Sequence, residues 1–561
     1  MTSDRFRHKW WGWGIEGVSY DIESRPGLPS FIRSKGVDVG EETTPRVTRD
    51  SINLPPRRVH SEFERALAEA VAPHQIAADD DGRLTHAFGR SYRDLVRLRA
   101  GEVTRPPDLV VYPEGHGDVV RIVELATRHD VTLIPFGGGT NVVGSVEPDL
   151  DDPRCVVTLD MRRMNRLLSV DEAAMTAIME AGMFGPEVEE SLNGHGLSLG
   201  HHPDSFVYST LGGWIATRSA GTQSNAYGKI EDMVLGLTVV TPTGTVETKP
   251  HPAASHGPDL NRLLVGSEGV LGIITKATMR VHRMPEMEEY RMLLFPNFQS
   301  GVEALHACMR AGYTPSLARI SDESETELMF AAKHPASGWK RWVEGPAKRW
   351  LARKGYQRPA ALIVGFEGPK ESTLELRAGA MRILRRHGAF DLGQSPGESW
   401  KEARYDAPYL RDFMMDFGTI ADSFETSVPW SGLMPVYREV TEIFQEAMLA
   451  ATGRPGYLGC HVSHLYETGA CLYYTFAASP LTLPTSRDLT DGYDTIKRAV
   501  TDAFMARGAA LSHHHAVGRE HRPWLAQEIG ELGLRSLRAV KDALDPTGIL
   551  NPGALLPPDS E

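Results

Sequence analysis

Cysteine is scarce in this chain of 561 residues, which holds only Cys155, Cys308, Cys460 and Cys471. The four are far apart and form no CxxC pair, which argues against a disulfide scaffold and a structural zinc site and favours a reducing compartment. Basic residues are also in deficit, with 60 Lys plus Arg against 73 Asp plus Glu and a net charge of −13. A nucleic-acid-binding protein needs a basic surface for phosphate contacts, so this class is excluded.

Long apolar runs are missing as well. No stretch of about 18 uninterrupted apolar residues is present, so we expect no membrane-spanning helix. The opening MTSDRFRHKWWGWG lacks the apolar segment of a secretory signal, and the closing PPDSE carries no peroxisomal tripeptide. These absences predict a cytoplasmic protein.

The composition that remains is ordinary for a globular protein, with 41% apolar and 24% charged residues. The length corresponds to about three to four domains. A polar, Arg-rich and Pro-rich stretch at 1–102 predicts an N-terminal extension or helical subdomain. Short strands alternate with amphipathic helices over 103–285, a second unit of helices and strands covers 286–500, and a C-terminal segment follows at 501–561.

A glycine loop follows the apolar strand VTLI. It reads PFGGGTNV (Pro135–Val142), and its three successive glycines leave backbone N–H groups free to converge on an anion. The alternative is a plain tight turn between two elements. The loop is not a GxGxxG motif before a helix, and GxxxxGK[ST] does not occur in the chain, so the ordinary Rossmann and P-loop interpretations are weak.

Two later segments share this small-residue character. Residues 200–221 combine glycines with hydroxyl side chains, and residues 265–281 read VGSEGVLGIITKATMRV. Small residues permit close backbone approach to a flat ligand, and the hydroxyl groups can bind its polar edge. Three such segments, spaced by roughly seventy residues, favour one shared anionic cofactor over three separate turns.

At these segments the sequence resembles the vanillyl-alcohol oxidase type (PCMH-type) of FAD-binding flavoproteins. The resemblance implies an α+β fold, with a FAD-binding domain of two α+β subdomains at 103–285 and an α+β cap (substrate) domain at 286–500. The segment 501–561 is then expected to return to the FAD domain and the active site. The glycine loop holds neither His nor Cys, so non-covalent FAD is favoured. The residues that this resemblance assigns to FAD are Pro135, Phe136, Gly137, Gly138, Gly139, Thr140, Asn141, Asp204, Ser205, Ser209, Thr210, Gly213, Thr217, Arg218, Ser219, Ala220, Glu268, Gly269, Val270, Leu271, Gly272, Ile273 and Ile274.

Further motifs are similar to the alkyldihydroxyacetonephosphate synthase family. They are KWWGWG at 9–14, residues 202–244, DSFETSVPW at 422–430, YETGACLYYTF at 466–476 and SHHHAVGR at 512–519. The resemblance implies ether-lipid synthesis: the acyl chain of acyl-dihydroxyacetone phosphate is exchanged for a long-chain alcohol, which releases a fatty acid. This family's exchange uses a flavin N5 adduct without net redox. One departure is His202, where the family has Glu.

The same resemblance assigns the catalytic roles. Tyr473 matches the family's proton-transfer tyrosine, and His513, His514 and His515 are expected to supply cationic neighbours that bring its pKa toward neutrality. If SHHH is extended, His513 and His515 face one side and His514 the other. The alternative for Tyr473 is a half-buried packing residue. No metal is expected at the histidines, because adjacent residues of a strand diverge.

Arginines are expected to bind the substrate. Arg411 matches the family's substrate-contacting arginine, and a guanidinium fits the geometry of a phosphate; the alternative is a solvated surface arginine. Arg319 matches an arginine important for activity, or else it pairs structurally with Asp322 or Glu323. His201 and Thr210 match residues near the flavin ring, and His201 is also expected to bind the substrate.

Residues 339–356 carry four aromatic and six basic residues and a local charge of +5, which is typical of a segment at a membrane interface. We therefore expect peripheral membrane contact and lipid substrates; the alternative is a solvated helix with cations over a Trp-lined core. A homodimer is the default expectation. The alternative function is a FAD-dependent 2-hydroxy-acid dehydrogenase of the lactate or glycolate type, and a non-catalytic lipid-binding or flavin-binding protein is a distant third.

Overall fold

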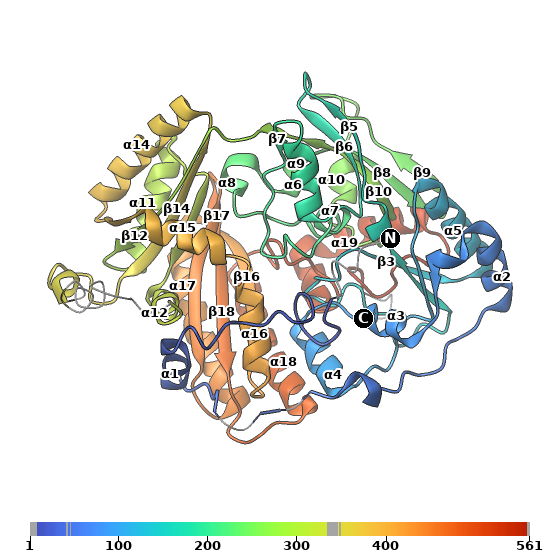
Figure 1. Ribbon diagram of the computed structural model, residues 1–561, viewed down its shortest axis with the longest axis horizontal. Coiled ribbons are helices and arrows are strands. Elements are labelled where there is room, and N and C mark those ends of the chain that lie inside the picture. The colour runs from blue at the N-terminus through green and yellow to red at the C-terminus, as the bar shows by residue number, and fades with distance from the viewer. Residues whose placement is uncertain (1–7, 41–42, 45, 334–345, 347–348, 558–561) are drawn as a thin grey trace.

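The computed structural model describes residues 8–40, 43–44, 46–333, 346 and 349–557. Figure 1 shows two halves side by side, one built from the early part of the chain and the C-terminal segment, and the other from the middle of the chain. The strands of the described residues form four sheets, of four, five, two and seven strands. Helices and sheets are mixed in both halves, so the predicted α+β fold class is confirmed.

The first sheet carries the glycine loop. Its strands are β1 (Ile76–Ala77), β2 (Leu109–Val111), β3 (Thr132–Phe136) and β4 (Val156–Asp160), in the order β1-β2-β4-β3. Strands β2, β4 and β3 are parallel, and α5 (His116–His129) connects β2 to β3. This helix buries residues 119, 122, 123 and 126, the spacing of an amphipathic helix. Because β3 ends at Phe136, the glycine loop starts at the edge of the sheet.

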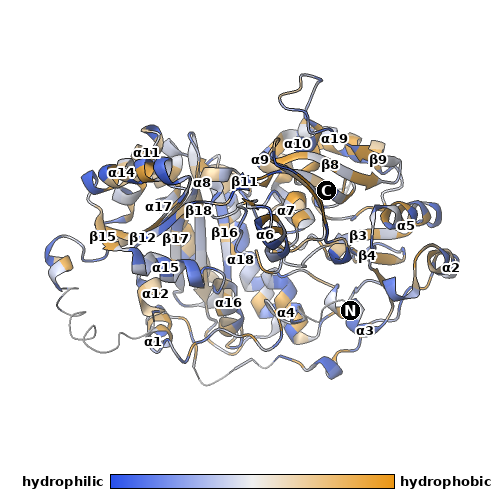
Figure 2. Ribbon diagram, turned by 45° about the horizontal axis from the view of Figure 1, so that its top comes forward, coloured by the Kyte–Doolittle hydropathy of each residue, from blue (hydrophilic) through white to orange (hydrophobic). Residues whose placement is uncertain are grey.

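The second sheet is antiparallel and lies in the same half. Its order is β5 (Leu167–Asp171), β6 (Thr176–Glu180), β10 (Ile273–Arg280), β8 (Val234–Thr241) and β9 (Gly244–Glu247). The connection from β6 to β8 holds α6 (Gly185–Asn193), β7 (Leu197–Ser198), α7 (Leu211–Thr217), α8 (Ser224–Tyr227) and α9 (Ile230–Met233). Strand β7 pairs with β11 (His282–Arg283), and α10 (Leu260–Leu264) precedes β10. Figure 2 shows that β8 is largely hydrophobic, as expected for a strand buried inside the fold.

The third sheet is the seven-stranded antiparallel sheet of the other half. Its order is β15 (Phe390–Gly393), β12 (Met287–Phe295), β14 (Ala360–Gly368), β13 (Leu317–Ser321), β17 (Tyr457–Leu465), β18 (Gly469–Ala478) and β16 (Ile420–Pro429). Four helices cover one face of it: α11 (Phe298–Arg310), α14 (Lys370–Arg386), α17 (Trp430–Thr452) and α18 (Ser486–Ala506). Val462, Leu472 and Phe476 point into the core on this helix-covered face.

Side chains alternate between the two faces of a strand, so the residues next to these core positions point away from the helices. Tyr473 on β18 lies directly opposite Glu425 on β16 and opposite His461 on β17. Since residues that face each other across a ladder share one side of the sheet, these three side chains form a row. Arg319 on β13 has the same orientation, because its neighbour Ile320 lies in the helix-covered core. This polar face is directed at the first half of the molecule.

The remaining helices pack around these sheets. They are α1 (Gly27–Ser34), α2 (Ser61–Ala70), α3 (Asp80–Thr85), α4 (Tyr92–Ala100), α12 (Glu323–Ala331), α15 (Gln394–Ala403), α16 (Ala407–Met415) and α19 (Leu525–Leu544). Helix α2 packs on α5, whereas α4 packs on α18, so the first hundred residues contact both halves. Among the described helices, none has the length and apolar character needed to cross a bilayer.

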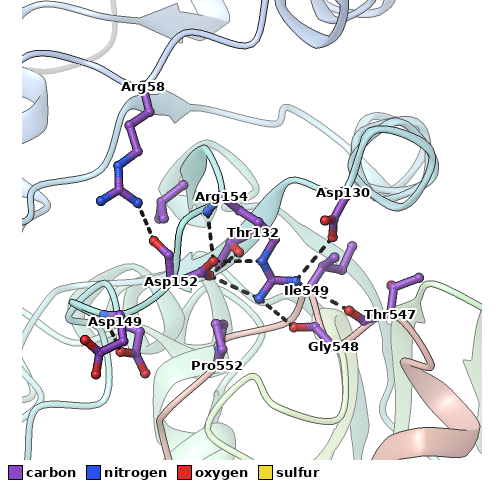
Figure 3. Close-up of polar contacts among 12 residues, drawn as sticks. Arg58, Asp130, Thr132, Asp149, Asp152, Arg154, Thr547, Gly548, Ile549 and Pro552 are labelled. Atoms are coloured by element: carbon purple, nitrogen blue, oxygen red, sulfur yellow. Dashed lines mark hydrogen bonds and ion pairs between the residues drawn. The ribbon is translucent and has the colours of Figure 1, made fainter.

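The C-terminal segment lies against the first sheet, as Figure 3 shows. The backbone N–H of Leu133 donates to the carbonyl of Ile549 at 2.9 Å, so the segment runs beside β3. Arg154 donates to the carbonyl of Gly548 at 3.1 Å, and its Nε donates to Asp152 at 2.8 Å. The guanidinium therefore joins the nearby Asp152 carboxylate to carbonyls near the end of the chain, far from it in sequence, which fixes this segment beside β3.

Candidate active site

A single cavity of about 1220 Å³ is lined by both halves of the molecule. The first half contributes the glycine loop and residues around α7, and the second half contributes the polar face of the seven-stranded sheet. Ligand cavities are commonly about 300–1,000 Å³, so this one has room for more than one drug-sized molecule.

The glycine loop has the shape of an anion-binding nest. Gly139 adopts a φ of +67°, and a Cβ at Gly138 would lie 1.7 Å from the carbonyl oxygen of Tyr208. A Cβ at Gly137 would lie 2.2 Å from Oγ1 of Thr210, so only glycine permits this close approach. Within the described part of the chain, the backbone N–H groups of Gly138, Gly139 and Thr140 have no acceptor. They line the cavity and remain available to a phosphate.

Glu268 joins three segments at the edge of this nest. It is 5% exposed, adopts a φ of +50°, and accepts hydrogen bonds from the Ser145 hydroxyl and from the backbone N–H groups of Val517 and Gly518, the latter two within 3.1 Å. Asn551 donates to its carbonyl at 2.7 Å. Burial raises the pKa of Glu268, while these donors lower it. The residue thus holds the glycine loop, the segment before β10 and the C-terminal segment together.

Most residues assigned to FAD line the cavity. Those that do are Pro135, Phe136, Gly137, Gly138, Gly139, Thr140, Asn141, Asp204, Ser205, Ser209, Thr210, Gly213, Thr217, Ser219, Ala220, Glu268, Gly269, Gly272 and Ile274. Four others lie away from it. Arg218 extends toward Glu231 at 3.1 Å, and the side chains of Val270, Leu271 and Ile273 are buried in apolar clusters. Their packing therefore supports the wall rather than a ligand.

Tyr473 is the centre of the polar row on the sheet. Its hydroxyl lies 2.7 Å from the hydroxyl of Ser423, and its ring stacks on His461 with centroids 4.8 Å apart. All three residues line the cavity. Burial first, and then the charge of Asp204, raise the pKa of Tyr473 well above its ordinary value. The phenol therefore carries its proton in this state.

Arg319 lies in the same row and is paired with Glu325. Its Nη2 donates to Glu325 Oε1 at 2.7 Å, and Nδ1 of His461 lies 3.0 Å from the same oxygen. Arg319 was expected to pair with Asp322 or Glu323 if its role is structural; the partner is instead the neighbouring acid of α12. Burial alone would raise the pKa of Glu325, but the charges of His461 and Arg319 hold it well below its ordinary value. Arg319 and Glu325 therefore form an ion pair at the cavity wall, in which the two charges balance.

The three histidines lie in an irregular turn, so the extended arrangement does not apply. Their backbone N–H groups all donate to the buried carboxylate of Glu425, at distances of 2.7–3.1 Å, and the Ser512 hydroxyl donates to it at 2.7 Å. His514 and His515 line the cavity, with ring centroids 5.8 and 5.6 Å from that of Tyr473. His513 does not line it; its Nε2 lies 2.6 Å from the Tyr466 hydroxyl.

The expectation of cationic histidines beside Tyr473 is wrong for this state of the site. Burial lowers the pKa of His514 to about 3 and also lowers that of His515, in spite of the opposing effect of Glu425. Burial would raise the pKa of Glu425 itself, but the neighbouring histidines and the Ser512 hydrogen bond hold it well below its ordinary value. The turn therefore presents neutral imidazoles over an ionised carboxylate.

One group of possible metal ligands occurs among the described residues. Glu425, Cys471, His513 and His514 place their ligand atoms within 4.8 Å of one another. Both oxygens of Glu425 already accept N–H donors, and Nδ1 of His513 lies 2.9 Å from Nδ1 of His514. Burial raises the pKa of the Cys471 thiol well above its ordinary value. A thiol and a saturated carboxylate are poor ligands, so this group is better explained as the anchor of the histidine turn.

Arg411 projects from α16 into the cavity. Its Nη1 donates to Asp422 at 3.3 Å, and its Nε is buried without an acceptor among the described residues. Asp422 also accepts a hydrogen bond from the Tyr493 hydroxyl at 3.2 Å. The guanidinium is thus held at the cavity wall by one carboxylate and still has a free donor for an anion.

His201 and His202 are placed behind the wall and do not line the cavity. His201 is 0% exposed, packs against Trp214 with the two rings tilted, and has Nε2 3.2 Å from the Ser219 hydroxyl. The ring of His202 packs on Phe206 with centroids 4.6 Å apart. Burial lowers the pKa of both imidazoles to about 3. Direct substrate contact by His201 therefore has no support in this geometry.

Sequence reasoning missed several residues of the site. His461, Ser423 and Glu425 lie beside Tyr473 on paired strands, Asp422 accepts a hydrogen bond from Arg411 of α16, and Trp13 lines the cavity from the N-terminal segment. Three of these, Asp422, Ser423 and Glu425, stand in the DSFETSVPW motif, so the motif carried a signal. Their roles depend on strand register, which the motif does not contain.

Two family models match this chain. A FAD binding domain matches residues 107–249, and the C-terminal domain of FAD linked oxidases matches residues 284–555. The fold and the cavity therefore belong to a FAD-linked flavoprotein, which confirms FAD as the predicted cofactor.

Comparison with named relatives narrows the class of flavoprotein to one family. An alkyldihydroxyacetonephosphate synthase of Trypanosoma brucei brucei is 42% identical, covering 100% of this chain and 94% of the relative. A solved structure of an alkyldihydroxyacetonephosphate synthase is 36% identical, covers 97% of each chain and gives a TM-score of 0.83. The mitochondrial D-lactate dehydrogenase (cytochrome) of Arabidopsis thaliana is 25% identical, covering 94% of this chain and 85% of the relative. The chain belongs to the alkyldihydroxyacetonephosphate synthase family, and the hydroxy-acid dehydrogenases are more distant.

The close packing of the glycine loop predicts that one added methyl group weakens FAD binding. Gly138→Ala places a Cβ against the Tyr208 carbonyl, so the loop must shift and FAD affinity should fall roughly tenfold or more, by analogy with overpacked cores. FAD titration of the apoprotein measures this. Gly432→Ala, in open space on α17, is the matched control and should bind FAD like the parent. Equal affinities for both variants would contradict the nest.

Proposed function

We propose that this protein is a FAD-dependent alkylglycerone-phosphate synthase, which exchanges the acyl chain of acyl-dihydroxyacetone phosphate for a long-chain alcohol. The observation that supports it is one cavity in which four features meet. The glycine nest, the Tyr473 row, the Arg411 guanidinium and an apolar wall all line the same space. The sequence identity of 42% to a synthase over the whole chain supports the same function.

FAD fits the residues present. The three free N–H groups of the glycine loop suit its pyrophosphate, and Gly212 and Gly213 of α7 line the cavity without side chains, which leaves room for a flat ring. When bound, FAD supplies an electron-accepting ring that supports substitution at carbon without net oxidation. The residues of the chain must then bind the phosphate, move protons and hold the alkyl chains.

Charge states in the site indicate how the proton moves. A protonated Tyr473 phenol, with Ser423 at 2.7 Å, can donate to the departing carboxylate oxygen. The imidazoles of His514 and His515 line the cavity beside Tyr473 and can accept the proton from the substrate carbon, because the carboxylate of Glu425 opposes the burial that lowers their pKa and so favours their protonated form. We therefore assign donation to Tyr473 and acceptance to the histidine turn, in place of a phenolate base.

The apolar wall suits two long chains. Leu328 and Met329 of α12 and Leu410 and Met414 of α16 line the cavity beyond Arg411. Burying alkyl chains there is favourable by about 0.8 kcal/mol for each CH₂ group. A small 2-hydroxy acid would leave most of this apolar surface exposed to water, so the wall favours lipid substrates over lactate or glycolate.

The central test is product formation. Purified holoenzyme incubated with palmitoyl-dihydroxyacetone phosphate and hexadecanol should yield hexadecyl-dihydroxyacetone phosphate and palmitate, detected by mass spectrometry. Anaerobic spectra should show no flavin reduction by lactate or glycolate. Bleaching of the flavin by a hydroxy acid, with no ether product, would establish the dehydrogenase instead.

Arg411 is predicted to bind the substrate phosphate. Arg411→Ala removes a charged donor and should raise KM for the phosphorylated substrate roughly 10- to 100-fold, since hydrogen bonds to charged groups contribute about 1.5–3 kcal/mol. Arg411→Lys should recover part of the loss, because lysine keeps the charge but not the paired donors. The control is Arg487→Ala, whose side chain is 88% exposed on α18. A fall in FAD content with an unchanged KM would place the phosphate elsewhere.

We also propose that the protein draws its lipids from a membrane surface through residues 339–356. Half of this segment lies outside the described residues, but it follows α12, and the residues just after this helix line the cavity as far as Lys333. Trp350 of the segment is 48% exposed. Vesicles with anionic lipid should carry the protein upward in flotation, and neutral vesicles should carry much less. Replacing the six basic residues of the segment by Gln should abolish flotation. Flotation that survives this replacement would exclude the segment.

A further inference from the structure

The motif KWWGWG near the start of the chain forms a closed loop that docks on α16, the helix of Arg411. The backbone N–H of Lys9 donates to the carbonyl of Gly14 at 2.9 Å, which closes the loop. The backbone N–H of Trp13 donates to Asp412 Oδ2 at 2.7 Å, and Lys9 Nζ lies 3.5 Å from the same oxygen. Asp412 is the residue after Arg411, so the loop is anchored beside the candidate phosphate-binding arginine.

Both glycines of the loop are required for this close packing. A Cβ at Gly12 would lie 2.5 Å from the Asp412 carboxylate, and a Cβ at Gly14 would lie 2.1 Å from the Tyr409 hydroxyl. Gly14 also adopts a φ of +72°, which other residues rarely tolerate. The Tyr409 hydroxyl lies 2.6 Å from that of Tyr208, the residue on which the glycine loop packs. The loop therefore docks where α16 meets the cofactor segments.

Trp11 and Trp13 of the loop have different surroundings. Trp11 faces cations: Arg46 lies 3.5 Å and Lys9 5.0 Å from its ring. Trp13 instead lines the cavity, packs edge-on against Tyr208 and is only 4% exposed. Its indole Nε1 is buried and has no acceptor among the described residues. The indole N–H of Trp13 is thus a donor at the cavity wall with nothing to bind in the described part of the chain.

A buried donor without a partner is unfavourable, and a ligand that accepts the hydrogen bond recovers this cost. The Nε of Arg411, on the helix that the loop contacts, is likewise buried and has no acceptor among the described residues. Both buried donors, one cationic and one neutral, belong to residues that line the cavity, and both residues adjoin Asp412: Arg411 in sequence and Trp13 through its backbone hydrogen bond. A phosphate group has several oxygens and suits two such donors at once.

We propose that Trp13 is a phosphate-binding residue of the active site, whose indole N–H donates to a phosphate oxygen of the ligand in the cavity. The phosphate belongs either to the substrate, next to Arg411, or to the pyrophosphate of FAD, next to Tyr208. This inference rests on the proposed function for its substrate form only. The N-terminal loop is then part of the active site, and each position of its motif has a structural reason, since Trp10 packs against the large apolar core.

The test is Trp13→Phe in the full-length holoenzyme, with Trp11→Phe as the matched control in the same loop. Phenylalanine keeps an aromatic ring and removes only the N–H donor and the second ring. KM for palmitoyl-dihydroxyacetone phosphate, kcat, and the Kd of FAD are measured for both variants. In the control all three should equal the parent values, since the cations can still lie over the phenyl ring that replaces the indole.

A rise of roughly tenfold or more in KM with unchanged FAD affinity supports the substrate phosphate, and the same rise in the Kd of FAD with unchanged KM supports the pyrophosphate. Unchanged values of both overturn the proposal, as does an equal loss in Trp11→Phe, which would show a merely structural role of the loop. A parent enzyme without turnover would overturn the proposed function instead, and FAD titration would still decide the pyrophosphate form.

Discussion

The alternation of side chains in the seven-stranded sheet is the constraint on which the site depends. Because successive residues of β16, β17 and β18 point to opposite faces, the strands bury Val462, Leu472 and Phe476 against helices and turn Glu425, His461 and Tyr473 to the other face. There His461 and Tyr473 line the cavity, and Glu425 lies under the histidine turn. A slip of one residue in any ladder would exchange the two sets. The large apolar core on the helix-covered face therefore fixes the register of the catalytic row.

Irregular segments of the site are held by buried carboxylates instead of by helices or strands. Glu425 accepts three N–H donors of the histidine turn, Glu268 accepts those of Val517 and Gly518, and Asp412 accepts that of Trp13. Each acid satisfies backbone donors that burial would otherwise leave unpaired. The same carboxylates bring remote parts of the chain to one cavity, since their partners are separated by 87 to 399 residues.

Local features of the sequence predicted the cofactor region well. The residues that form the glycine loop are consecutive in the sequence, and the α+β alternation and the Tyr473 strand are likewise local patterns. The histidine turn was less accessible: its charge state follows from desolvation, and its shape follows from Glu425, so an extended run of cationic histidines was a wrong expectation. His461 had no local signal, because its position opposite Tyr473 depends on strand pairing. Arg218, Val270, Leu271 and Ile273 lie in matching motifs, yet alternation and packing turn them away from the cavity.

The position of Arg411 explains how one cavity can serve a charged headgroup and an alkyl chain. Asp422 holds one nitrogen of its guanidinium on the sheet side, while Leu410 and Met414 on the same helix face the cavity with apolar surface. A short helix thus carries the boundary between the polar row and the apolar wall. The position of α16 is fixed by Asp412, which accepts a hydrogen bond from the N-terminal loop. The boundary therefore depends on residues nearly four hundred positions away in the chain. A lipid with an anionic head would be oriented by this boundary alone, with its reactive carbon beside Tyr473 and its chain along α12 and α16.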